Sequence, residues 1–254
     1  MKTNIAIIGS GNLGIAIAKG LVNSQLVPDA AQGLGVRISI HNKEAVAISD
    51  IIILCVQPKQ LEEVLTEIKP LLQEEKHLLV STITGISIDE ISAQLDNKKI
   101  PIVRAVPNTA IAIGTSMTCL CHKHANEAQV ASIVRLFNCL GETLLIEERL
   151  MKAATVLAAS GIAFFMRYLR AATQAGIQLG FDAKEAQHIA VQTAKGAALL
   201  LQTSDSHPES EIDKVTTPEG CTIAGLNEME HQGLSSALIK GILTSFEKIN
   251  SIRK

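Results

Sequence analysis

The sequence predicts an α/β domain with a parallel sheet over residues 1–148, followed by an all-α domain over residues 149–254. Three observations lead to this prediction. Short apolar runs alternate with helix-like runs in the first part of the chain, which is typical of a parallel sheet covered by helices. A glycine-rich stretch at residues 9–14 joins the first strand-like run to the first helix-like run. Beyond Leu150, strand-like runs are scarce and small residues are frequent.

The expected elements follow from the length and spacing of the apolar runs. Strands are expected at residues 4–8, 36–40, 51–56, 77–81, 101–106, 116–121 and 143–146. Helical spacing predicts helices at residues 12–25, 61–72, 87–94 and 127–139. In the second part we expect helices from 150 to 201, a loop that begins at His207 and Pro208, a turn over residues 215–222 and a final helical stretch.

The predicted helices of the second part are rich in Ala and Gly and have a thin polar face. Small residues let helices approach one another closely. The apolar surface of a helix with so little polar surface must be buried, and a second subunit would bury it. We therefore expect a homo-oligomer.

The composition excludes several classes of protein. Of the 254 residues, 47% are hydrophobic, and 23 Lys and Arg residues stand against 25 Asp and Glu residues, for a net charge of −2. This balance argues against disorder and against a nucleic-acid partner. The chain has no Trp, one Tyr and five Phe residues, too few aromatic rings for a base-stacking surface.

Five Cys residues in a chain of this length do not make a disulfide framework, so we expect a reducing, cytoplasmic location. The apolar run at the N-terminus, residues 5–8, is too short for a signal peptide. The longest apolar segment, residues 153–166, falls short of the ~20 residues that span a bilayer. We therefore expect no membrane partner.

The glycine-rich stretch is the strongest local motif. It follows a predicted strand and opens a predicted helix, which is the setting of a dinucleotide-binding turn. In such a turn the first glycine allows the bend, the second lets the backbone approach a pyrophosphate, and the third packs helix against strand. The predicted cofactor-binding residues here are Gly9, Ser10, Gly11, Asn12, Leu13 and Gly14.

The residues at the end of the second predicted strand, residues 36–40, should indicate whether the protein prefers NAD or NADP. A carboxylate there binds the ribose 2′-hydroxyl, whereas polar and basic residues suit a 2′-phosphate. His41, Asn42 and Lys43 follow the strand, with Glu44 one residue later. This pattern favours NADPH through Asn42 and leaves NADH open. The alternative is an ordinary solvated turn.

Two further predicted strands end in segments that could line the ligand crevice, which lies at the carboxyl ends of parallel strands. The first segment supplies the candidate cofactor-binding residues Cys55, Val56, Gln57, Pro58 and Lys59. In the second, Asn108 could hydrogen-bond the nicotinamide amide. Arg104, in the strand before it, is equally well explained as a structural ion-pair residue.

Two other clusters have structural alternatives. Cys119, Cys121, His122 and His124 lie within six residues, but their spacing is not that of a closed zinc site, so no metal is expected. The segment from Thr216 to Thr222 has the hydroxyl and proline of a helix start. It could cap a helix only, or it could bind the carboxylate of a substrate at the helix N-terminus.

Taken together, these segments resemble the pyrroline-5-carboxylate reductase family. The resemblance covers nearly the whole chain, and its most specific part is the Val-Thr-Thr-Pro-Glu-Gly-Cys-Thr stretch at residues 215–222. It implies a Rossmann-like domain, then an all-α dimerisation domain, with dimers that assemble further into decamers. It also implies that the active site lies between the cofactor domain and the helical domains of the dimer.

The chemistry implied by the resemblance is hydride transfer from NADPH, or NADH, to the cyclic imine pyrroline-5-carboxylate, which gives L-proline in the last step of proline biosynthesis. Backbone N–H groups around Thr217, Gly220 and Cys221 would hold the substrate carboxylate. The hydroxyl of Thr222, the candidate catalytic residue, would lie near the ring nitrogen. Because a protonated imine is already electrophilic, position and a proton donor are the main requirements.

The sequence departs from the family pattern in three places. The chain is short between the first helix and Val36, where family members have a further strand and helix. Residues 158–163 read Ala-Ala-Ser-Gly-Ile-Ala in place of Ser-Gly-Ser-Gly-Pro-Ala, and Glu219 stands where the family has Gly. Two alternatives therefore remain: a related reductase of another small imine or acid, and a cofactor-binding protein without turnover.

Overall fold

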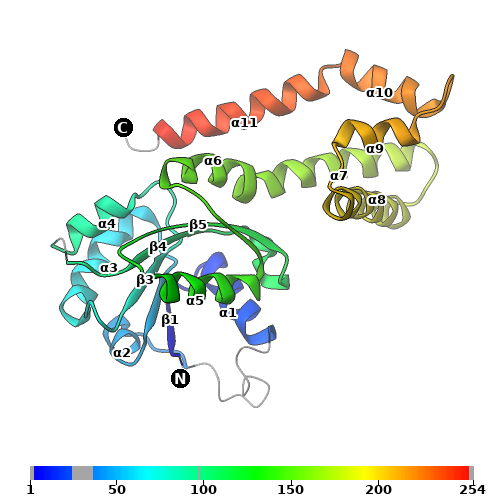
Figure 1. The fold of residues 1–254 in the computed structure, drawn as a ribbon. Helices are drawn as coiled ribbons and strands as arrows, with labels where there is room; N and C mark the ends of the chain where they lie inside the picture. The colour runs from blue at the N-terminus through cyan, green and yellow to red at the C-terminus, as the bar shows by residue number, and fades with distance from the viewer. Residues whose placement is uncertain (1–2, 25–36, 97, 252–254) are drawn as a thin grey trace. The chain divides into compact units, whose positions relative to one another are not determined.

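The computed structural model describes residues 3–24, 37–96 and 98–251 (Figure 1). The chain forms two compact units. Residues 1–160 and 246–254 make up the first, called here the N-terminal unit. Residues 161–245 make up the second, the helical unit.

A six-stranded sheet forms the centre of the N-terminal unit, with the strands in chain order from β1 to β6. The first four strands are parallel to one another, β5 is antiparallel to β4, and β6 is parallel to β5. The strands are β1 (Ile5–Ile8), β2 (Ile51–Leu54), β3 (Leu78–Ser81), β4 (Ile102–Val106), β5 (Ser116–Lys123) and β6 (Gly141–Leu145).

The antiparallel strand β5 was not expected from the sequence. A parallel neighbour needs a crossover of about a dozen residues or more, usually a helix. The connection from β4 to β5 spans residues 107–115 and holds only the 3₁₀ helix η4 (Thr109–Ile113). The chain therefore turns back, and Arg104 pairs with Cys121 across the two strands.

Helices cover both faces of the sheet (Figure 1). On one face, α2 (Asn42–Ala47), α3 (Leu61–Ile68) and α4 (Ile88–Gln94) share a buried cluster with Ile52 and Leu54. On the other, α1 (Asn12–Asn23) and α5 (Glu127–Asn138) share a cluster with Ile51 and Ile53. Because β2 faces helices on both sides, it is apolar at every position.

The strand expected at residues 36–40 is wrong for residues 37–40, and Val36 lies outside the described residues. Ile38 and Ile40 are 90% and 91% exposed. Instead, His41 is the N-terminal flanking residue of α2. The alternating pattern did not make a strand here because alternation predicts a strand only where a neighbouring strand and a core face exist to receive it. Among the described strands, β1 and β6 are the two edges of the sheet, and β1 is the edge nearest to residues 37–40 in the chain order of the strands.

The described helices beyond residue 160 follow one another with short connections. They are α7 (Gly161–Gln178), α8 (Ala183–Ser204), α9 (Pro208–Val215), α10 (Cys221–His231) and α11 (Leu234–Ser251). A Cβ atom on Gly176 of α7 would come within 2.9 Å of the Cβ of Ala186 on α8. The small residues therefore do let these two helices approach closely.

The loop expected from His207 and Pro208 is instead the start of α9. The backbone N–H of Glu209 donates to Nδ1 of His207 at 3.2 Å, so the imidazole caps the helix. Pro208 occupies the first helical position, where its fixed φ suits the helix and its missing N–H is not needed.

Residues 148–178 form one helical run. It begins with the 3₁₀ turn η5 (Glu148–Leu150), continues through α6 (Met151–Ala154) and a π-helical turn η6 (Thr155–Ser160), and ends with α7. An 18-residue stretch within this run has a mean hydropathy of 1.4, and the run is long and apolar enough to cross a membrane by length and composition alone. The sequence-based estimate of residues 153–166 was too short because the helix continues on both sides of that segment.

Candidate functional site

The glycine-rich turn after β1 is built by close backbone packing. Gly9 has φ +111°, a left-handed region that favours glycine, and a Cβ there would lie 2.5 Å from the carbonyl oxygen of Cys55. A Cβ on Gly14 would overlap the carbonyl oxygen of Gly9. The first and third glycines therefore bring the turn, α1 and the end of β2 into direct contact.

The middle glycine faces open space. A Cβ on Gly11 would meet no protein atom within 4 Å. Gly11 flanks the N-terminus of α1, and no side chain caps this helix end. Free space beside the first N–H groups of a helix suits a phosphate group, so the turn fits the pyrophosphate of a dinucleotide. Ser10, Asn12 and Leu13 belong to the same turn and first helical positions.

The segment after β2 lies against this turn. The backbone N–H of Cys55 donates to the carbonyl of Ile8 at 2.7 Å, and the side chain of Val56 borders Gly9. Burial raises the pKa of the Cys55 thiol, against the smaller opposing effect of its hydrogen bond with Thr82. The thiol therefore stays neutral at pH 7 and acts as an apolar wall.

The rest of that segment forms a short helical turn. Pro58 and Lys59 belong to the 3₁₀ helix η2 (Pro58–Gln60), and Gln57 precedes it. The N–H of Gln57 donates to the side-chain oxygen of Gln60 at 3.1 Å. Gln57 and Lys59 are exposed, so their side chains are accessible to a ligand.

Thr82 lies beside the candidate site, and the sequence-based interpretation did not include it. It follows β3 as Cys55 follows β2, and its hydroxyl donates to the carbonyl of Leu54 at 2.9 Å. The same hydroxyl lies 3.5 Å from the sulfur of Cys55. The rule that parallel strands end at the ligand crevice, applied to β3, would have identified it.

Asn108, which follows β4, has partners within the protein on both ends of its amide. Its Oδ1 accepts from the N–H of Ala110 at 3.0 Å, and its Nδ2 donates to the carbonyl of Ala158 at 3.3 Å. Its backbone N–H donates to the hydroxyl of Ser116 at 3.0 Å. The structure thus brings Asn108 together with Ala158, the first residue of the segment that departs from the family pattern.

The structure supports the interpretation of Arg104 as a structural ion-pair residue. Its side chain is 6% exposed, and Nη1 lies 3.0 Å from Oε1 of Glu148. The same carboxylate oxygen accepts the N–H of Ile88 at 2.7 Å. The ion pair therefore connects β4, α4 and the start of the long helical run.

Asn42, the candidate for the ribose end of the cofactor, lies in the first turn of α2. Its Nδ2 donates to a carboxylate oxygen of Glu67 on α3 at 2.7 Å. Glu44 accepts the hydroxyl of Ser39 at 3.0 Å and lies 3.8 Å from the guanidinium of Arg37. The carboxylate beside the predicted ribose site is thus already partnered.

The candidate substrate segment is a tight turn before α10. The N–H of Gly220 donates to the carbonyl of Thr217 at 2.9 Å, and Glu219 has φ +60°. Proline followed by a residue with positive φ is typical of a type II turn, where glycine is the usual third residue. A Cβ on Gly220 would lie 2.5 Å from the hydroxyl oxygen of Thr217.

Cys221 and Thr222 open α10 directly after this turn. Cys221 is exposed and Thr222 is half-buried. No side chain caps the helix at Gly220. The segment therefore does not cap α10 through a side chain. The N–H groups at the start of α10 are left in a position that suits an anion.

The cysteines and histidines between Cys119 and His124 lie on strand β5 and in the bend that follows it. Within the described ranges, no group of three or more potential metal-binding side chains comes together. Cys119 and Cys121 are buried in β5, and burial raises the pKa of the Cys121 thiol to about 11. These thiols serve as small apolar residues of the core, as the spacing argument predicts.

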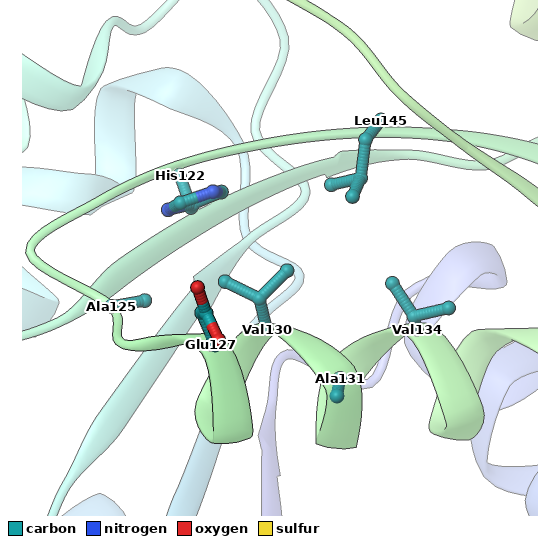
Figure 2. A pocket seen from close by; sticks show the side chains of 7 residues that line it. All are labelled: His122, Ala125, Glu127, Val130, Ala131, Val134 and Leu145. Carbon is teal, nitrogen blue, oxygen red and sulfur yellow. The ribbon is translucent and has the colours of Figure 1, made fainter.

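Figure 2 shows a separate hollow of about 320 Å³ between α5 and the last two strands. Val130 and Val134 of α5 point toward Leu145 of β6, and His122 and Glu127 lie at one end (Figure 2). None of the candidate site residues lines it.

Comparison with known proteins gives one consistent family. Residues 148–252 match the family model described as pyrroline-5-carboxylate reductase dimerisation. Residues 4–85 match the model described as NADP oxidoreductase, coenzyme F420-dependent.

Relatives of known name belong to the same family. Pyrroline-5-carboxylate reductase 2 of Dictyostelium discoideum is 44% identical over 274 residues, which cover 96% of this chain and 91% of that protein. Pyrroline-5-carboxylate reductase 1 of the same organism is 46% identical, and this chain spans about half of its length, 49%. A solved pyrroline-5-carboxylate reductase from Coxiella burnetii superimposes with a TM-score of 0.90, at 25% identity and full coverage of both chains.

Proposed function

Because this chain belongs to the pyrroline-5-carboxylate reductase family, we propose that it reduces pyrroline-5-carboxylate to L-proline, the last step of proline biosynthesis. The observation that carries the proposal is the turn at residues 9–14, closed against Cys55 and open at Gly11. The family evidence favours this function over a related reductase of another substrate and over a cofactor-binding protein without turnover.

In this proposal the N-terminal unit holds the nicotinamide cofactor. The turn at residues 9–14 binds the pyrophosphate. The segments after β2, β3 and β4 line the crevice for the nicotinamide half, since these strands follow β1 in order across the described sheet. When bound, the nicotinamide supplies the hydride that adds to the imine carbon. The half-buried Cys55 thiol and the buried, hydrogen-bonded Thr82 would keep water from that side of the crevice.

We propose NADPH as the preferred cofactor, with NADH as the alternative. The support is the charge around residues 37–44. Glu44 is engaged by Arg37 and Ser39, so it does not present a free carboxylate to a ribose 2′-hydroxyl. Lys43 is exposed at the start of α2 and adds a positive charge suited to a 2′-phosphate.

The substrate is assigned to the turn before α10. We propose that backbone N–H groups around Thr217, Gly220 and Cys221 bind its carboxylate, while the N–H of Gly220, which donates to the carbonyl of Thr217, fixes the turn. We propose further that the hydroxyl of Thr222 hydrogen-bonds the ring nitrogen. The fixed turn and the absence of a side-chain cap at Gly220 support this assignment. Thr222 would then position the imine and hold its proton during the hydride addition.

We further propose that two copies of the chain associate through residues 149–254, and that dimers form decamers. Helices of this part expose large apolar side chains in the single chain, among them Phe165, Met166, Tyr168, Leu179, Leu200 and Leu238. Exposed apolar surface on this scale marks an interface. A second copy would also cover the apolar run at residues 148–178 without a membrane. Five free thiols support a cytoplasmic location.

The direct test is oxidation of NADPH and of NADH by the purified protein, with and without pyrroline-5-carboxylate. The proposal predicts oxidation that depends on the substrate and is faster with NADPH. Cofactor oxidation that is unaffected by pyrroline-5-carboxylate would reject the proposed substrate. Faster turnover with NADH would reject the cofactor preference alone.

A Glu219→Gly variant is expected to bind pyrroline-5-carboxylate more tightly and to be slightly more stable. Glycine removes a carboxylate from the substrate turn and adopts φ +60° without strain, which is worth about 1 kcal/mol. We expect a lower KM, an unchanged kcat and a higher midpoint of unfolding, measured by steady-state kinetics and thermal denaturation.

The control variant Glu219→Gln separates charge from backbone strain, because glutamine keeps the side-chain length and the left-handed strain. It should lower KM without raising stability. A KM that responds to neither variant would show that the Glu219 carboxylate lies away from the bound substrate.

A further inference from the structure

The amide of Asn108 connects two segments of the N-terminal unit that are 50 residues apart. Its Oδ1 caps η4 through the N–H of Ala110, and its Nδ2 donates to the carbonyl of Ala158 in the π-helical turn η6. The backbone of Asn108 is fixed as well, since its N–H donates to Ser116. The side chain is therefore held by partners within the protein at both ends.

The π-helical turn lies at the crevice end of the sheet. The turn contacts β4 and β5, and Ala158 is hydrogen-bonded to Asn108, which lies two residues after the end of β4. The carboxyl end of a parallel strand such as β4 is where the crevice forms. π-helical turns contain an extra residue per turn and occur frequently at functional sites. The turn therefore borders the part of the crevice assigned to the nicotinamide.

We infer that Asn108 is a positioning residue: it acts on the reduction by holding the Ala158 carbonyl, and so the π-helical turn, in place, and not by binding the nicotinamide amide. This inference rests on the proposed function. A wall that shifts by about 1 Å can cost a reaction up to a hundredfold in rate while leaving most cofactor contacts intact. Loss of the Ala158 hydrogen bond should therefore affect kcat more than cofactor affinity.

Two variants test this without removing the helix cap. In Asn108→Asp and Asn108→Ser an oxygen can still accept the N–H of Ala110, but the amide donor to Ala158 is lost. The matched control is Asn126→Asp, because Asn126 caps α5 in the same way, accepting the N–H of Gln129 at 2.9 Å. Each protein is titrated with NADPH by fluorescence, assayed for kcat and KM, and melted to compare stability.

Each assay is repeated with the reduced 3-acetylpyridine analogue of NADPH, in which the carboxamide is replaced by an acetyl group. We expect both Asn108 variants to lose at least tenfold in kcat with either cofactor, to keep the NADPH Kd within twofold and to melt near the wild type. Asn126→Asp should match the wild type in kcat.

Two results would overturn the inference. A loss of NADPH affinity that accompanies the loss of kcat would mean that Asn108 binds the nicotinamide amide directly. If that loss shrinks with the acetylpyridine analogue, the bond is to the amide N–H, and if it persists, the bond is to the carbonyl oxygen. Wild-type kcat in both variants would mean that the Ala158 contact has no role in the reaction. Both of these results apply only when the wild-type protein reduces pyrroline-5-carboxylate in the same assay. An inactive wild type would instead reject the proposed function and the inference with it.

Discussion

A Gly14→Ala variant is expected to lose measurable binding of NADPH. The added Cβ would overlap the carbonyl oxygen of Gly9, and that oxygen belongs to the backbone, so the turn itself must move. Movement of the turn misplaces the N–H groups at the start of α1 that the pyrophosphate requires. We expect a Kd raised by about a hundredfold or more, measured by fluorescence titration, together with about 1–3 kcal/mol of destabilisation from overpacking.

The matched variant Gly11→Ala separates binding from folding. Its Cβ meets no protein atom within 4 Å, so the unfolding midpoint should equal that of the wild type. The methyl group would nevertheless occupy the space that the pyrophosphate needs, and the NADPH Kd should rise by about tenfold or more. Normal NADPH binding by Gly11→Ala would mean that the cofactor does not lie on this turn.

The second large effect is expected from Arg104→Met. The substitution keeps the apolar length of the side chain but leaves Glu148, which is one-third exposed, without its cation. Removing one partner of a fully buried ion pair lowers the free energy of unfolding by about 3–5 kcal/mol. Because Glu148 is partly exposed, we expect the loss for this pair to lie at or below the lower end of that range. We expect about 2–3 kcal/mol lower stability in urea denaturation at a fixed protein concentration.

Lys123→Met is the matched control for Arg104→Met. Lys123 forms an ion pair with Asp89 at 2.6 Å, but both side chains are largely exposed. Exposed pairs contribute about 0–1 kcal/mol, so this variant should unfold close to the wild type. Equal destabilisation by the two variants would show that burial of the Arg104 pair does not determine its contribution.

The parts of the fold that the sequence predicted are those governed by local pattern. Fully apolar runs such as Ile51–Leu54 identify strands that face helices on both sides, and they lie within the ranges expected. The direction of β5 was not predictable in this way. It depends on whether the connection from β4 is long enough for a crossover, and that is set by where one strand ends and the next begins.

Local pattern also misled in two places. Residues 37–40 alternate like a strand, yet strand formation needs a neighbouring strand, which is a tertiary condition. At His207 and Pro208 the sequence indicates a break, but the same residues start a helix when the imidazole accepts a backbone N–H. A proline at the first helical position and a proline in a loop look alike in sequence.

In the candidate site, too, the features set by local sequence were predicted and those set by tertiary contacts were not. The turn at residues 9–14 was identified because its glycines follow one another along the chain. The link between Asn108 and Ala158 was not, because it joins residues 50 positions apart through a backbone carbonyl, and a carbonyl leaves no trace in the sequence. Glu219 was recognised as unusual, but its left-handed backbone was visible only in the structure.

The proposed function requires that this chain move a hydride from its cofactor to the imine carbon of pyrroline-5-carboxylate. The most direct measurement uses NADPH carrying deuterium at the transferable position, with mass spectrometry of the product. We expect L-proline that carries one deuterium, formed only when enzyme, cofactor and pyrroline-5-carboxylate are all present. Recovery of unlabelled substrate, under conditions where an authentic reductase labels proline, would contradict it.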